Sequence, residues 1–200
     1  MSAIVEHPPI TADDLLALRD GKRFELVHGE LVEKDMGWES EWIGTNLLWF
    51  LGGYCRQHGG WVNGSSAGYR CFGESIPDDP DRVRKPDVSY IASGRIAAGR
   101  LPTGHCEVVP DLVVEVNSPN DRGSVVEAKV DEYLQAGVRL VWVIDPQSES
   151  VRVHRLDGTV RDLGLDDKLD GEDVAPGFHC AVRELFATPS AGAKTKAPSP

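Results

Sequence analysis

The sequence predicts an α/β domain, and three consecutive stretches carry that prediction. Residues 111–116 and 140–144 are apolar segments of strand length, and the second stops at Asp145-Pro146. Between them, apolar residues recur at helical spacing over 124–136. A strand, a helix and a second buried strand form a βαβ unit, so the two strands are expected to be parallel and central in a mixed sheet flanked by helices.

A short helix, a hairpin and a long helix are expected before this unit. They span residues 11–20, 23–34 and 39–58. Thr11 is a favourable N-cap and Asp14 completes a capping box for the first helix. Gly29 supplies the positive φ of the hairpin turn. The long helix is indicated by apolar residues at helical spacing.

Shorter strands and a second hairpin complete the prediction. Strands are expected at 60–63, 67–72, 84–91 and, around the Asp157-Gly158 turn, at 151–156 and 159–163. The rest up to residue 186 is expected to be loop with a short final turn. With accessory hairpins near both ends, the domain lies at the border between α/β and α+β.

Length and composition indicate one globular domain. The chain of 200 residues is 40% hydrophobic and 26% charged. We expect a flexible segment at 1–9, the domain at 10–186 and a disordered tail at 187–200. The four cysteines lack metal-binding spacing, the N-terminus lacks a signal-peptide pattern, and no apolar run is long enough to span a membrane. These features predict a cytoplasmic protein with reduced thiols and no membrane contact.

The net charge of −11 counts against nucleic-acid binding, because phosphate contacts require Lys and Arg. It does not exclude such binding, since local fields matter and a bound divalent metal adds positive charge. Arg82, Arg84 and Lys85 form a basic cluster that could contact phosphate. Alternatively, the cluster offsets the acidic run at 78–81.

Glu115 is the most informative residue, because it places a carboxylate in an apolar strand. Such a carboxylate requires a cation, a metal or strong hydrogen-bond donors. Asp87 lies at the start of an earlier strand, and Lys129 lies on the helix that follows Glu115. Two carboxylates at one sheet edge suit Mg²⁺, and a nearby ammonium could orient an attacking water, which fits phosphodiester hydrolysis. A buried structural ion pair is the alternative from spacing alone.

Four motifs resemble the Uma2 family, which belongs to the PD-(D/E)XK restriction-endonuclease-like superfamily. They are FELVHGELVE at 24–33, KPDVSYI at 85–91, PDLVVEVNSPND at 110–121 and EAKVDEYLQAGVRLVWVIDP at 127–146. The resemblance covers about residues 10–186. It implies a mixed sheet flanked by helices and a nuclease site that uses Mg²⁺ or Mn²⁺ to cleave DNA.

The resemblance also implies roles for individual residues. Asp87 matches the Asp of the PD motif, and Glu115 matches the acidic residue of (D/E)XK. Asn117 stands where the superfamily has Lys, so Lys129 on the following helix is the natural replacement. Glu25 matches an acidic residue that the family places near the site. The expected catalytic residues are therefore Asp87, Glu115, Lys129 and Glu25, with Asp87, Glu115 and Glu25 as metal ligands.

Two departures keep other functions open. Family members often carry a His near the start of the long helix, where this chain has Glu41-Trp42. Together with Asn117 and the negative charge, this leaves an inactive binding protein of the same fold as one alternative. A metal-dependent hydrolase of a smaller phosphate substrate is another.

The apolar surface of Trp42, Trp49 and Trp142 further indicates a homodimer as a candidate assembly.

Overall fold

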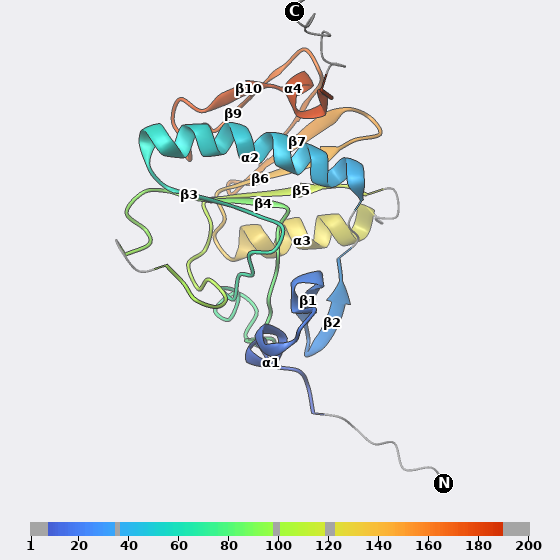
Figure 1. The fold of residues 1–200 in the computed structure, drawn as a ribbon, viewed down its shortest axis with the longest axis vertical. Coiled ribbons are helices and arrows are strands. Elements are labelled where there is room, and N and C mark those ends of the chain that lie inside the picture. Colours follow the sequence, from blue (N-terminus) through green and yellow to red (C-terminus); the bar gives the residue numbers. More distant parts are fainter. Residues whose placement is uncertain (1–7, 35–36, 98–100, 119–122, 190–200) are drawn as a thin grey trace, which may run out of the picture.

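The computed structural model describes residues 8–34, 37–97, 101–118 and 123–189. Its centre is a mixed six-stranded sheet of order β3-β4-β5-β6-β7-β8. The strands are β3 (Trp61–Gly64), β4 (Val88–Ile91), β5 (Leu112–Val116), β6 (Leu140–Asp145), β7 (Ser150–Arg155) and β8 (Val160–Leu163). Helix α2 (Trp38–His58) covers one face and α3 (Gly123–Gln135) covers the other (Figure 1).

The predicted βαβ unit is confirmed. Strands β5 and β6 pair in parallel, with Glu115 opposite Val143, while the other neighbours in this sheet are antiparallel. All five β5 residues are buried, because alternate side chains face α2 and α3. Leu112 and Val114 pack with the α2 core, whereas Val113 packs with the α3 core. By this alternation Glu115 lies on the α3 face.

An N-terminal unit lies on the α3 side of the sheet (Figure 1). It contains α1 (Ala12–Ala17), the 3-10 turn η1 (Gly21–Arg23), β1 (Phe24–Val27) and β2 (Glu30–Glu33). The predicted capping box of Thr11 and Asp14 is present, although the helix ends at Ala17 rather than near residue 20. Leu26 and Val83 exchange backbone hydrogen bonds, which attach the hairpin to the segment that leads to Asp87.

Three local predictions differ from the structure. Residues 67–72 form no strand, because the segment pairs at Tyr69 only, with Arg84 on one side and Cys106 on the other. The hairpin around Asp157-Gly158 forms, but β7 and β8 extend the central sheet instead of standing apart as an accessory. Strands β9 (Lys168–Asp170) and β10 (His179–Ala181) were expected as loop, because three-residue strands carry no usable periodicity.

Strands β9 and β10 and helix α4 (Val182–Phe186) lie on the α2 side of the sheet (Figure 1). The four cysteines are free thiols, as predicted. No helix in the described part of the chain is long and apolar enough to cross a bilayer. The segments predicted to be flexible or disordered, 1–9 and 187–200, lie mostly outside the described residues.

Candidate active site

The four residues predicted from the sequence line one small cavity of about 130 Å³. Glu25 comes from β1, Asp87 from the residue before β4, Glu115 from β5 and Lys129 from α3. The hairpin, the sheet and the helix therefore each contribute a charged group to the same space. The cavity lies beside the end of β5, where Val116 and Asn117 also line it.

Asp87 joins strands β4 and β5 through its backbone and its side chain. Its N–H donates to the Val114 carbonyl (3.0 Å), and its Oδ2 accepts the Val116 N–H (2.8 Å). Its Oδ1 accepts a hydrogen bond from Lys34 Nζ at 2.8 Å. One carboxylate oxygen is thus fixed to the sheet, and the fixed side chain presents the other oxygen to a cation.

Glu115 is 6% exposed and is held by two side chains from α3. Its Oε1 accepts a hydrogen bond from the Tyr133 hydroxyl (2.7 Å), and its Oε2 accepts one from Lys129 Nζ (3.3 Å). Burial raises the pKa of Glu115; Lys129 opposes this shift and the nearby Asp87 carboxylate adds to it. An ionised Glu115 therefore costs folding free energy, which a bound dication would offset.

Glu25 is 1% exposed and its two oxygens are occupied by groups of the chain. Its Oε1 accepts the Lys85 N–H and its Oε2 accepts Arg84 Nη1, both at 2.8 Å, while Lys129 Nζ lies 3.3 Å from Oε2. Burial alone would raise its pKa, but Lys129 and Arg84 lower the pKa to about 2. These contacts fit a counter-ion of Lys129 and Arg84, and the metal-ligand role expected for Glu25 stays a prediction.

Lys129 bridges the carboxylates of Glu25 and Glu115 at 3.3 Å each. Burial disfavours its ammonium, but these carboxylates raise the pKa of Lys129 above its ordinary value. Its side chain is 16% exposed, so it is not a solvated surface lysine. Lys129 enters the cavity as a charged ammonium.

Sequence reasoning missed Lys34 and Tyr133, which complete the surroundings of the carboxylates. The register of the β1–β2 hairpin places Val32 opposite Glu25, so Lys34, two residues further on, lies on the same side as Glu25. Tyr133 follows Lys129 by four positions on α3 and therefore shares its helix face. Hairpin register and helical spacing were the signals that could have identified both residues.

The cavity also contains oxygen atoms that could act as ligands of a hard divalent cation. Asp87 and Glu115 supply carboxylates, and the buried Oδ1 of Asn117 has no hydrogen-bond partner among the described residues. Mg²⁺ is commonly held by one or two carboxylates together with water. Within the described ranges, no group of three or more His, Cys, Asp or Glu side chains is placed to hold a metal ion. Glu25 does not add a third carboxylate to the pair, because it accepts a hydrogen bond from Arg84. The residues present fit a two-carboxylate metal site.

The basic cluster is not an exposed phosphate-binding surface. Arg82, Arg84 and Lys85 are all buried. Arg84 makes two hydrogen bonds to Glu132, at 2.7 and 2.8 Å, in addition to the one it makes to Glu25. Of the three, Arg82 alone pairs with the acidic run, through Asp79 at 2.8 Å, and Lys85 Nζ donates to the Gly21 carbonyl. The predicted compensation of residues 78–81 therefore holds for Arg82 only.

The start of α2, where the family resemblance predicts a His, borders the site. Glu41 and Asp87 line a second hollow of about 180 Å³. Ser65 donates a hydrogen bond to Glu41 at 3.2 Å. Thus a carboxylate lines the same hollow as Asp87 in the region where the resemblance predicts a His.

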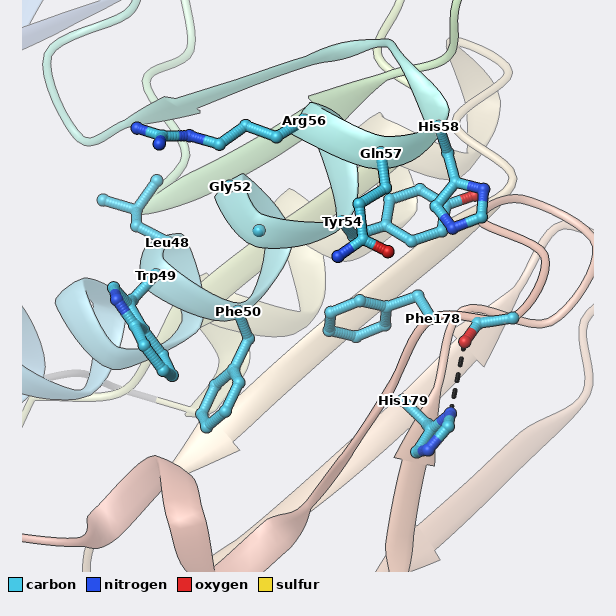
Figure 2. Close-up of a pocket in the computed structure, with 12 residues that line it drawn as sticks. Leu48, Trp49, Phe50, Gly52, Tyr54, Arg56, Gln57, His58, Phe178 and His179 are labelled. Atoms are coloured by element: carbon cyan, nitrogen blue, oxygen red, sulfur yellow. Dashed lines mark hydrogen bonds between the residues drawn. The ribbon is translucent and has the colours of Figure 1, made fainter.

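A more open groove of about 600 Å³ lies along the C-terminal half of α2 and the loop before β10 (Figure 2). Trp49 borders it and is 75% exposed. Trp142 is fully buried, and Trp42 donates its indole N–H to the Ala187 carbonyl at 2.9 Å. The homodimer expected from these tryptophans is therefore a prediction that rests on Trp49.

Comparison with known sequences identifies the family. The sequence pattern of Uma2, described as "Putative restriction endonuclease", matches residues 12–183. The chain belongs to the Uma2 family. The resemblance of the four motifs is thereby confirmed, and the Uma2 match includes the segments that carry Glu25, Asp87, Glu115 and Lys129.

A solved structure supports the Uma2 fold. It is a "putative nuclease belonging to DUF820" from Anabaena variabilis, with a TM-score of 0.72 and 22% sequence identity. The alignment covers 89% of this chain and 98% of that one. This confirms the predicted mixed sheet flanked by helices. Among the curated proteins, none matches the chain.

Proposed function

We propose that this Uma2 protein is a divalent-metal-dependent endonuclease that hydrolyses DNA phosphodiester bonds. One observation carries the proposal: Asp87, Glu115 and Lys129 come from three separate segments of the chain and line one cavity. The family description and the nuclease-like fold support the same reaction class.

In this proposal, Asp87 and Glu115 hold Mg²⁺ or Mn²⁺ together with Asn117 Oδ1. A metal held there would lower the pKa of water and would stabilise negative charge on the reacting phosphodiester. Lys129 orients the water or offsets charge on the scissile phosphate. Glu25 positions Lys129, and Tyr133 positions Glu115, through the contacts described above.

Replacing Lys129 with Met is expected to slow cleavage of supercoiled plasmid in Mg²⁺ by roughly a hundredfold, because one fixed positive charge leaves the reaction site. Lys129→Arg is expected to retain part of the activity. Lys168→Met removes an exposed lysine from β9 and serves as the matched control, with the activity of the original protein.

The same assay separates the alternatives. The proposal requires plasmid cleavage to depend on Mg²⁺ or Mn²⁺ and to stop when a chelator is added. Cleavage must also be slower with the Lys129→Met protein. Equal activity in all preparations would indicate a contaminating nuclease. Hydrolysis of bis(p-nitrophenyl) phosphate without plasmid cleavage would identify a hydrolase of small phosphate substrates. Inactivity on all substrates with either metal would favour the binding protein.

A further inference from the structure

Lys34 is a charged residue that lines the cavity and has no role in the proposed function. It follows β2 directly, and its backbone N–H is held by the Arg23 carbonyl at 2.9 Å. Its side chain is 5% exposed. Its Nζ donates to Asp87 Oδ1 at 2.8 Å and also to the Lys85 carbonyl. A buried ammonium thus lies directly on a proposed metal ligand.

The contact concerns the oxygen of Asp87 that a metal would use. Asp87 Oδ2 is engaged by the Val116 N–H, which leaves Oδ1 as the oxygen not bound to the sheet. Lys34 donates to this oxygen. A divalent cation and an ammonium at one oxygen repel each other.

The charges that line the cavity nearly cancel without a metal. Four carboxylates line it with three cationic side chains, namely Glu25, Glu33, Asp87 and Glu115 with Lys34, Arg84 and Lys129. A divalent cation added to this set leaves an excess of positive charge. A phosphodiester anion entering with the metal would offset it and would offer Lys34 a new acceptor.

We propose that Lys34 competes with the divalent metal for Asp87, and that a phosphate group of the substrate relieves this competition by accepting the displaced ammonium. The inference rests on the proposed function, because it assumes a metal on Asp87. It makes metal binding weak in the free protein and couples metal binding to phosphate binding. By thermodynamic reciprocity, the metal strengthens phosphate binding by the same factor.

The test is the Mn²⁺ affinity of the full chain, measured by calorimetric titration with and without a short phosphorothioate DNA duplex. Lys34→Met is expected to bind Mn²⁺ at least about tenfold more tightly than the original protein in the absence of DNA. The duplex is expected to tighten Mn²⁺ binding about tenfold in the original protein and clearly less in the variant. Mn²⁺ should also raise the melting temperature of the variant more.

Two further variants control the experiment. Lys22→Met removes an exposed lysine of the same N-terminal unit and is expected to leave Mn²⁺ affinity unchanged. Lys34→Gln keeps a donor for the Lys85 carbonyl and replaces Lys34→Met if the latter does not fold. The effect of the duplex on the original protein provides a test that needs no variant.

The outcomes separate the inference from the function. Unchanged or weaker Mn²⁺ binding in both Lys34 variants, with plasmid cleavage intact in the original protein, would overturn the competition alone. If the duplex does not change the Mn²⁺ affinity of the original protein, the competition is likewise overturned. Absence of Mn²⁺ binding in every protein, with and without DNA, would overturn both the inference and the metal-dependent function.

Discussion

Replacing Glu115 with glutamine is expected to slow Mg²⁺-dependent plasmid cleavage by roughly a thousandfold or more, because a proposed metal ligand loses its charge. Glutamine has nearly the same shape, and its carbonyl can still accept the hydrogen bond that the Tyr133 hydroxyl now donates to Glu115. The loss would therefore reflect chemistry in the cavity rather than altered packing.

The same substitution is expected not to lower the free energy of unfolding. Burial raises the pKa of Glu115 in the folded chain, so its ionised form costs stability at neutral pH, and this cost disappears as the pH falls below the folded pKa. A neutral glutamine avoids the cost, and Lys129 keeps Glu25 as a carboxylate partner at 3.3 Å. Urea unfolding at pH 7 checks this, and Glu127→Gln, an exposed change on α3, is the control. A strongly destabilised Glu115→Gln protein would show that Glu115 serves the fold.

Replacing Glu25 with glutamine is expected to have the opposite result, a loss of about 3 kcal/mol in the free energy of unfolding at pH 7. The pKa of Glu25 is lowered from 4.5 to about 2 in the folded protein. The ionised Glu25 therefore stabilises the folded protein fully above pH 4.5, and this stabilisation disappears as the pH falls toward 2. Removing it also leaves the positive charge of Arg84 beside a neutral group.

Urea unfolding between pH 7 and pH 2 measures this effect. Glu30→Gln is the matched control, because Glu30 lies on the same hairpin with an exposed side chain and is expected to change stability by less than about 0.5 kcal/mol. The difference between the two variants should shrink as the pH falls. A constant difference across the range would contradict the counter-ion role of Glu25.

The central fold could be predicted because its signals are local. The βαβ unit follows from two apolar strands around an amphipathic helix, and Glu115 stood out because it interrupts one of those strands. Residues 67–72 look like a strand in sequence, but their pairing depends on Arg84 and Cys106 from distant segments. Strands β9 and β10 are too short for any periodic pattern.

The members of the site were easier to predict than their roles. Asp87, Glu115 and Lys129 were singled out from their positions in the sequence and Glu25 by resemblance, and all four line one cavity. Whether Glu25 faces a metal or a cation depends on Arg84, which lies 59 residues further along the chain. A pairing over that distance leaves no periodic signal in the sequence.

The most direct test of a single shared metal site is the plasmid-nicking rate of the Asp87→Asn, Glu115→Gln double variant beside the two single variants. Both carboxylates are proposed to hold one metal, so either substitution alone should remove the metal-dependent reaction. We expect the double variant to be no slower than the slower single variant. A double variant slowed by the product of the two single effects would contradict a shared site.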